Sequence, residues 1–568
     1  MHSKRRLSAP ELLLGFALAS SGVVTACAGG DGASSAAAGG SGARAGATSS
    51  GGAGVAQGGV SADHAGAAPS NEAGATASEG GVGATTSEGG AGAAHSGAGG
   101  VGGSAAANNA GSQSVGGDEG LAGDSNASAG SSGSLNGAGG EAGAVDTSLK
   151  QPVYPAAKFP PENPDSDAKD MLGKILFWDE HVGSDDTMAC GTCHRTGKGG
   201  GSDPRAVEST KWNPGDDGVF GTNDDIHGSQ GIKYCTGGDG AAVSYAPAPA
   251  PSPFGLNRQI TSRRAPTYLD AMFAPELFWD GRASGQFVDP VSKAVLIQAG
   301  GALESQSVGP PMNAGEMACA QRSFASLLAK LASVTPLSLA KDVPPAMQAA
   351  ISAAHGSYTE LFAAAFPGAA SPLSAPHFAF AIATHERHLQ SDQTPWDRYN
   401  QFLNDPRTGD RNALTPAQVH GFELFMGKAK CGTCHIPPFF SDFKFHNLHF
   451  VTEKDLGRQA LPGHASDPPG QVKTANLRNV GLREAQGLFH YGYGPGLSLD
   501  AVLAWYNIPP GTITAQDIAQ DPLLASVTRL DLTTAEIADI LDFLRNGLTD
   551  PRVKNQAFPF DRPTLSSE

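Results

Sequence analysis

Two identical pentapeptides carry the clearest chemical signal in the chain. Cys190–His194 and Cys431–His435 both read Cys-Gly-Thr-Cys-His. In a Cys-x-x-Cys-His segment the two thiols attach haem c and the adjacent histidine ligates its iron. A zinc ribbon would need its cysteine pairs about 15–20 residues apart, far closer than these, and a thioredoxin-like pair gives no reason for the histidine. We therefore predict two covalent haem c groups, bound by Cys190, Cys193, Cys431 and Cys434, with His194 and His435 as iron ligands.

Two of the other cysteines, Cys235 and Cys319, have no motif of their own. Spare thiols in an exported protein often pair. The sequence leaves two alternatives, a Cys235–Cys319 disulfide or two buried free thiols.

The N-terminus has the pattern of an export signal. The basic run Lys4-Arg5-Arg6 precedes a short apolar segment that ends in Val24-Thr25-Ala26-Cys27. This ending resembles the lipobox of bacterial lipoproteins, so we expect residues 1–27 to be a lipoprotein signal and Cys27 to be lipidated. The alternative is an ordinary signal peptide cleaved near Ala26. The expected location is the periplasm, with a lipid anchor in the outer membrane as the only membrane contact.

Residues 28–147 are rich in Gly, Ala and Ser and contain no Phe, Trp or Tyr. Such a segment buries too little apolar surface to fold, so we predict a disordered linker. A single compact domain spanning all 568 residues is therefore excluded, as is a multi-span membrane protein. The net charge of −17 argues against a nucleic-acid partner.

The elements that must position the two motifs are mainly helical. Apolar spacing predicts a helix around 168–176, before the first motif. Thr415-Pro416-Ala417-Gln418 and Thr533-Thr534-Ala535-Glu536 each have the pattern of a capping box that starts a helix. Alternating strand patterns are scarce. We expect a mainly α fold with two cytochrome-c-like haem domains, 148–400 and 401–568.

Longer segments around both motifs resemble the bacterial di-haem cytochrome c peroxidases and their MauG-type relatives. The resemblance covers most of 165–565. It is carried by these segments: Leu172-Gly173-Lys174-Ile175-Leu176-Phe177-Trp178-Asp179, Arg264-Ala265-Pro266-Thr267-Tyr268-Leu269, Leu277-Phe278-Trp279-Asp280-Gly281-Arg282-Ala283, Asn313-Ala314-Gly315-Glu316-Met317, Leu424-Phe425-Met426-Gly427-Lys428-Ala429-Lys430, Leu477-Arg478-Asn479-Val480 and Phe489-His490.

The resemblance implies that the first haem, with His194 on its proximal side, reacts with hydrogen peroxide. Glu316 then matches the distal carboxylate that moves protons during O–O cleavage. Gln306 and Pro310 match further distal-pocket positions. Trp279 matches the tryptophan between the haems, where an indole can relay electrons. The plainer alternatives are a solvated loop carboxylate for Glu316 and a core side chain for Trp279.

For the second haem the resemblance implies His435 and a further axial ligand. That ligand is Met in the peroxidases and Tyr in MauG-type proteins. No Met follows Met426, and the matching stretch ends in Tyr506, so we expect Tyr506 to be the ligand. Tyr491 and Tyr493 are the alternatives.

The chain departs from the family pattern in three ways. Between the first motif and Arg264 the only histidine is His227, which favours a five-coordinate first haem that is open to peroxide. Arg264 and Arg483 stand at positions linked to the family's calcium ion, which leaves calcium a weak expectation, since a guanidinium could replace a cation. The loops in 195–255 and between Trp279 and Glu316 are enlarged.

These observations favour a peroxidase that reduces hydrogen peroxide with electrons from a small cytochrome c or copper protein. The first alternative is a MauG-type enzyme that oxidises a Trp or Tyr on a partner protein. The second is a non-enzymatic electron-transfer cytochrome, and oxygenase chemistry on a polymer is the least supported. Fold resemblance alone does not decide among these functions.

Overall fold

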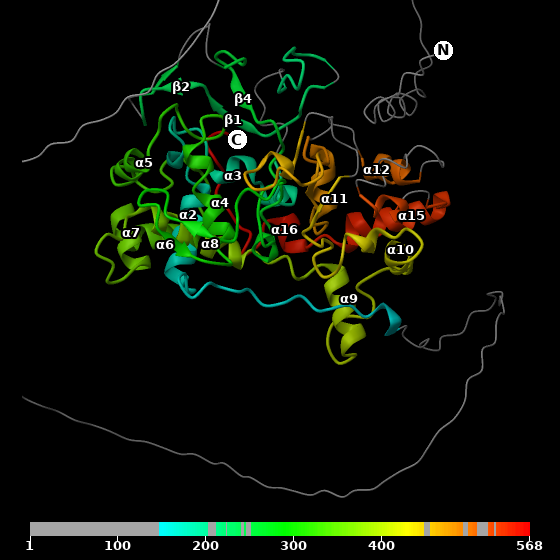
Figure 1. Ribbon diagram of the computed structural model, residues 1–568. Coiled ribbons are helices and arrows are strands. Elements are labelled where there is room, and N and C mark those ends of the chain that lie inside the picture. The colour runs from blue at the N-terminus through cyan, green and yellow to red at the C-terminus, as the bar shows by residue number, and fades with distance from the viewer. Residues whose placement is uncertain are drawn as a thin grey trace, which may run out of the picture. The chain divides into compact units, whose positions relative to one another are not determined.

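Helices make up most of the regular structure in the described part of the chain (Figure 1). The computed structural model describes residues 147–202, 212–222, 224–239, 243–245, 252–447, 455–491, 498–507, 521–527 and 530–568. Cys27 with the expected signal peptide 1–27, and the expected linker up to residue 146, lie outside these ranges. Within them, no helix is long and apolar enough to cross a lipid bilayer. The prediction of a mainly helical fold is confirmed for the described residues.

The α-helices of these ranges are α2 (Asp167–Trp178), α3 (Cys190–Cys193), α4 (Ala302–Ser307), α5 (Phe324–Leu331), α6 (Pro345–Ala353), α7 (Tyr358–Ala365), α8 (Ala375–His388), α9 (Pro395–Asn404), α10 (Pro416–Met426), α11 (Val480–Arg483), α12 (Leu499–Tyr506), α14 (Leu524–Val527), α15 (Thr534–Asp542) and α16 (Pro551–Asn555). The described strands are short and pair antiparallel: β1 (Gln230–Lys233) with β4 (Arg258–Ile260), β2 (Cys235–Thr236) with β3 (Ser244–Tyr245), β5 (Phe287–Val288) with β6 (Val295–Ile297), and β7 (Phe445–His446) with β8 (Val472–Lys473).

The helix predicted before the first motif is confirmed as α2. Its N-cap residue, Ser166, accepts a hydrogen bond from the backbone amide of Lys169. The helix packs closely against α8, because a Cβ added at Gly173 would lie only 1.9 Å from the backbone oxygen of Ala381. A glycine at this position therefore lets the two helices touch, and α2 leads directly into the segment that carries the first Cys-x-x-Cys-His motif.

The two predicted capping boxes are also confirmed. Thr415 and Gln418 close the N-terminus of α10, and Thr533 and Glu536 close that of α15. The two helices pack against each other beside the second motif, and their apolar faces contribute to one buried cluster that includes Phe422, Phe425, Ile540, Leu541 and Phe543.

Two main hydrophobic clusters form the core. The first is built largely from α2 and α5–α8, and the second from α9, α10, α12 and α15 (Figure 1). The end of the chain returns to the first cluster, where Val553, Phe560 and Leu565 are buried. These residues belong in sequence to the expected second domain, 401–568. The division into 148–400 and 401–568 stays a prediction.

A buried ion pair joins the segments on either side of the second motif. Arg478 and Asp397 are both buried, and the Arg478 Nη1 lies 2.7 Å from the Asp397 Oδ2. The same guanidinium donates to the backbone oxygens of Ser391, at 2.7 Å, and Pro438, at 2.8 Å. A charge pair with this many hydrogen bonds is satisfied in spite of its burial, and it fixes the segment after the second motif against the start of α9.

Candidate functional site

One cavity of about 940 Å³ brings the predicted site residues together. It is bordered by both Cys-x-x-Cys-His motifs and by residues from segments far apart in sequence. Every described residue to which we assigned a catalytic or haem-binding role lines it: Cys190, Cys193, His194, Trp279, Gln306, Pro310, Glu316, Cys431, Cys434, His435 and Tyr506.

The first motif forms the short helix α3 and is set up for a metal ligand. The Thr192 hydroxyl accepts a hydrogen bond from the backbone amide of Ala189, which fixes the start of this turn. The His194 Nδ1 lies 3.4 Å from the backbone oxygen of Gly200. Burial lowers the pKa of His194 to about 4, so the imidazole is neutral at ordinary pH. A neutral ring whose Nδ1 faces a carbonyl presents its Nε2 to a metal.

The second motif repeats this arrangement on a different local structure. Cys431–Thr433 form a single 3-10 turn. The His435 Nδ1 lies 2.8 Å from the backbone oxygen of Phe440, and burial lowers the pKa of His435. The four motif cysteines are free thiols, and burial raises the pKa of Cys193 to about 12 and that of Cys434 to about 11. Unpaired thiols beside an oriented imidazole, twice in one cavity, fit two haem c groups.

Glu316 lies in a tight turn at the edge of the cavity. The Asn313 Nδ2 donates a hydrogen bond of 3.0 Å to the Glu316 Oε1, and the Asn313 backbone oxygen accepts from the amides of residues 316–318. Burial raises the pKa of the Glu316 carboxyl, while the charge of Arg282 opposes the rise. A smaller pocket of about 240 Å³ shares Phe278, Arg282 and Glu316 with the main cavity. Since Arg282 and Asn313 are exposed, this pocket leads from Glu316 toward solvent.

Gln306 and Pro310 stand on the short segment before that turn. Gln306 belongs to α4, and Pro310 begins a 3-10 turn, Pro310–Met312. The helix α4 is anchored by Glu304, whose buried carboxylate receives two hydrogen bonds from Arg387 of α8, at 2.6 and 2.9 Å. This bidentate pair sets the position of α4 and hence of the two distal candidates.

Trp279 lies in the chain between the two motifs. Its indole Nε1 donates a hydrogen bond of 2.7 Å to the backbone oxygen of Arg264. The ring lies beside His490, with 5.7 Å between the ring centroids. Its backbone oxygen accepts a bond from the amide of Lys473. The indole is thus held in one orientation at the cavity wall.

Tyr506 ends α12 and lines the part of the cavity near the second motif. Burial raises the pKa of Tyr506, and Cys431 and Cys434 add to the rise, which places all three groups close together. Of the alternatives, Tyr491 is buried and is not among the residues that line this cavity. Tyr493 lies outside the described residues.

His227 is directed away from the cavity. Its ring stacks on Trp212 with 3.9 Å between centroids, and it is not among the lining residues. Its backbone oxygen accepts a hydrogen bond from the guanidinium of Arg264. The second arginine at the family's calcium-linked positions, Arg483, donates to the backbone oxygens of Gly199, Asn476 and Arg478.

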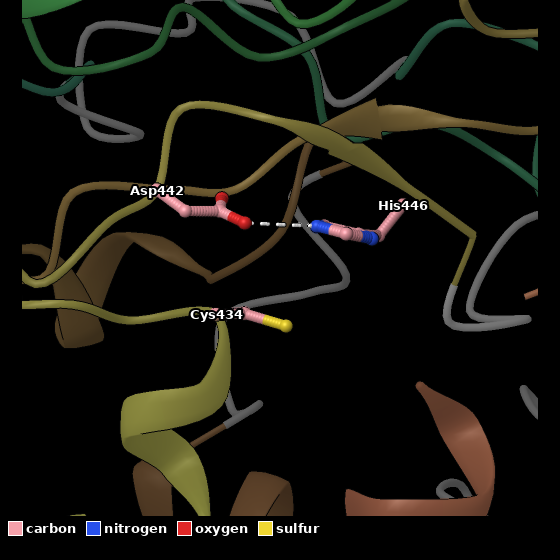
Figure 2. Close-up of side chains that lie close together, drawn as sticks. All are labelled: Cys434, Asp442 and His446. Carbon is pink, nitrogen blue, oxygen red and sulfur yellow. Dashed lines mark hydrogen bonds and ion pairs between the residues drawn. The ribbon is translucent and has the colours of Figure 1, made fainter. Parts of the chain in front are cut away.

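Two features of the cavity were not found from the sequence. Glu386 of α8 is buried at the cavity, and burial raises its pKa to about 8. Its position within the charged run His385–His388 gave no sign of this. His446 lies between Asp442 and Asp521, at 3.1 and 3.2 Å, close to Cys434 (Figure 2). Burial alone would lower the pKa of His446, but hydrogen bonds to the two carboxylates raise it.

The question of the spare cysteines is settled. Cys235 and Cys319 form a disulfide, 84 positions apart in sequence, so the alternative of two free thiols is wrong.

The chain is similar to several known proteins. Residues 167–404 match the family model described as di-haem cytochrome c peroxidase. The methylamine utilization protein MauG of Methylorubrum extorquens is 27% identical over 348 residues, which cover 61% of this chain and 70% of that protein. The cytochrome c peroxidase Ccp of Escherichia coli is 26% identical over 360 residues, which cover 62% of this chain and 56% of that protein.

A crystal structure of a MauG-like protein associated with microbial copper homeostasis is 21% identical and covers 72% of this chain and 96% of its own, with a TM-score of 0.45. The family match over residues 167–404 and the curated relatives show that the chain is similar to di-haem cytochrome c peroxidases and MauG proteins.

Proposed function

We propose that the protein reduces hydrogen peroxide to water at the first haem, with electrons that arrive from a small redox protein through the second haem. The observation that carries this proposal is the single cavity, which is lined by both haem-attachment motifs, by Glu316 and by Trp279. A carboxyl group and two metal-ligand sets in one enclosed space suit a reaction that consumes two electrons and two protons per peroxide.

Residues around the first motif perform the protein's part of this reaction. A haem held by Cys190, Cys193 and His194 would supply the iron and the electrons that peroxide reduction needs. Glu316 takes a proton from one oxygen of the peroxide and returns it to the other, which leaves as water. Burial suits Glu316 to this role, because a raised pKa brings a carboxyl closer to working pH.

The electrons reach the first haem from the second. His435 and Tyr506 are the proposed ligands there, and Trp279 is the proposed relay between the two groups. The donor is a small cytochrome c or copper protein. Because His227 is stacked on Trp212, away from the cavity, the first haem needs no ligand to leave before peroxide binds.

The carboxylate gives the sharpest test. Glu316→Gln should keep both haems and lose about 100-fold or more in kcat, the usual contribution of a positioned acid–base group. In the native protein the rate should fall as pH drops through the Glu316 pKa, which burial places above that of an exposed Glu, and the variant should lack this limb. The control is Glu360→Gln, an exposed carboxylate of α7. Native kinetics in Glu316→Gln would end the proposed role.

A second candidate function rests on Tyr506. A phenolate ligand stabilises oxidised iron, which favours a MauG-type enzyme that oxidises a Trp or Tyr of a partner protein. Peroxide added to the fully oxidised protein without a donor distinguishes the two. A long-lived species with a near-infrared band supports the second candidate, whereas a reaction that leaves no such species supports the peroxidase. No reaction before one haem is reduced would contradict the open first haem.

We also propose that Cys27 is lipidated and anchors the protein to the outer membrane on its periplasmic side. The support is the sequence Val24-Thr25-Ala26-Cys27 at the end of the apolar run. The disulfide Cys235–Cys319 fits an oxidising compartment.

A further inference from the structure

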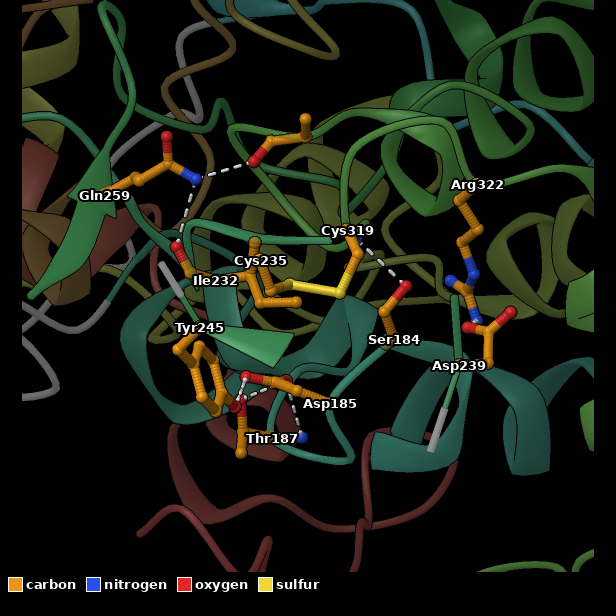
Figure 3. The surroundings of a disulfide bond; sticks show 12 residues. Ser184, Asp185, Thr187, Ile232, Cys235, Asp239, Tyr245, Gln259, Cys319 and Arg322 are labelled. Carbon is orange, nitrogen blue, oxygen red and sulfur yellow. Dashed lines mark hydrogen bonds and ion pairs between the residues drawn. A yellow bond between two sulfur atoms is a disulfide. The ribbon is translucent and has the colours of Figure 1, made fainter. Parts of the chain in front are cut away.

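The turn that carries Glu316 is held by two distant segments of the chain, residues 230–239 and 258–260. The backbone amide of Ile232 donates a hydrogen bond of 2.8 Å to the backbone oxygen of Glu316 itself. From the paired strand, the Gln259 Nε2 donates to the backbone oxygen of Ala314 at 2.6 Å and to that of Ile232 at 3.2 Å (Figure 3). One amide side chain thus joins the turn to the segment that supports it.

A covalent bond fixes the same contact. Cys235 follows β1, and Cys319 stands three residues after Glu316. Their disulfide is buried, and the Ala320 amide donates a hydrogen bond of 2.8 Å to the Cys235 backbone oxygen beside it. The Cys319 amide donates to the Ser184 Oγ at 3.0 Å, as Figure 3 shows. The C-terminal end of the Glu316 turn is therefore tied to two other segments.

The N-terminal end of the turn is anchored from the same side. The Arg322 guanidinium is buried and pairs with Asp239 at 2.6 Å. It also donates to the backbone oxygens of Pro311, at 3.0 Å, and Val182, at 2.6 Å. Pro311 directly precedes the turn, so this arginine links it to the loop that follows β2.

No space separates the segment from the turn. A Cβ added at Gly231 would lie 1.9 Å from the backbone oxygen of Gly315. A displacement of β1 toward the cavity would therefore push the residue next to Glu316. By contrast, within the described part of the chain the Glu316 side chain accepts a hydrogen bond only from Asn313 of the same turn. The direction of the carboxylate thus depends on where its backbone is held.

We propose that strand β1, Gln259 and the Cys235–Cys319 disulfide, here called the clamp, are positioning residues that set the Glu316 carboxylate for proton transfer. The inference rests on the proposed role of Glu316. A competing explanation is that the clamp only stabilises the fold, since Ile232, Cys235 and Cys319 also belong to the first hydrophobic cluster. The test must separate these two effects.

The main variant is Cys235→Ala with Cys319→Ala, made alone and together with Glu316→Gln. Alone, it should retain both haems and lose at least about tenfold in kcat, because small displacements of a reacting group are costly. Its acid limb should also move to lower pH, since a loosened turn exposes the carboxyl to water. Combined with Glu316→Gln it should add less than about twofold, because two changes that act through one group are not additive.

A milder variant tests the clamp if the double cysteine variant does not fold with its haems attached. Gln259→Met keeps the volume and removes the hydrogen bonds to Ala314 and Ile232. It should reproduce the loss in kcat and the shift of the acid limb. The matched control is Tyr245→Phe, which removes a hydrogen bond from β3 to Asp185 and leaves the Glu316 turn untouched. That control should keep native kinetics.

The outcomes separate the clamp from the proposed function. Native turnover in Glu316→Gln would overturn the role of Glu316, whatever the clamp variants do. The clamp alone would be overturned if Glu316→Gln lost turnover while both Gln259→Met and the double cysteine variant kept native turnover. Losses that multiply in the Glu316→Gln background would likewise overturn it, because they would mean that the segment supports the fold rather than the carboxylate.

Discussion

At the scale of single residues, the proposed second haem depends most on Tyr506. The residue ends α12, faces the cavity and lies close to Cys431 and Cys434. Tyr506→Phe keeps the aromatic ring and removes the oxygen. We expect the low-spin absorption and electron paramagnetic resonance signals of one haem to change while those of the other stay as they are, because an axial oxygen ligand is lost at one iron only.

Tyr491→Phe is the control for this change. Tyr491 is buried but is not among the residues that line the cavity. Tyr491→Phe should therefore keep the native spectra of both haems. A spectrum of Tyr506→Phe that matches the native one would refute the assignment and turn attention to Tyr493.

The sequence alone predicts which cysteines and histidines form the two haem-attachment motifs. The thiols and histidines of Cys190–His194 and Cys431–His435 are contiguous, so their chemistry is visible without a fold. Glu386 is different. It carries a pKa raised to about 8 only because α8 turns it toward the cavity. Burial of one carboxyl in a run of charged residues is a tertiary property and has no local pattern.

At the scale of elements, the sequence predicted the helix starts that depend on contacts between residues close together in the chain. The capping boxes at Thr415 and Thr533 involve side chains three residues apart, and both helices begin where expected. The clamp was not predicted, because its strands β1 and β4 are short and its contacts with the Glu316 turn join residues 55 to 84 positions apart. The enlarged loop 195–255 contains β1 and Cys235 of the clamp.

The contact between α2 and α8 gives an element-scale prediction. Gly173→Ala places a Cβ 1.9 Å from the backbone oxygen of Ala381, so the two helices must separate. We expect the free energy of unfolding to fall by about 1–3 kcal/mol, the usual cost of overpacking a core. Denaturant unfolding of the haem-loaded protein measures it. The control is Ala346→Ser at an exposed position of α6, which should leave the free energy of unfolding unchanged. Ala350→Gly on the same helix is unsuitable as a control.

At the scale of the whole molecule, the segments around the two motifs are tied together by arginines. Arg478 pairs with Asp397 at the start of α9. Arg483 donates to backbone oxygens of the segments that follow each of the two motifs. One of these, Gly199, lies five residues after the first iron ligand, His194. The other oxygens belong to residues 476 and 478, beyond the second motif. Main-chain oxygens gathered around one positive charge resemble the ligand set of a hard cation.

We expect the Arg483 guanidinium to take the place of a cation between the segments that follow the two motifs, so that the protein does not need calcium. Burial lowers the pKa of Arg483 to about 10, yet the guanidinium stays charged at neutral pH. Prolonged treatment with a calcium chelator should leave peroxide turnover and the free energy of unfolding unchanged. Arg483→Met should lower the free energy of unfolding by about 3 kcal/mol, because buried carbonyl oxygens lose their donor.

The matched control is Arg407→Met, since Arg407 is largely exposed and its hydrogen bonds go to Asp405. That variant should unfold as the native protein does. Loss of turnover on chelation, restored by added calcium, would contradict the assignment. If Arg483→Met regained stability when calcium was added, the ion and the guanidinium would be shown to serve the same carbonyl oxygens.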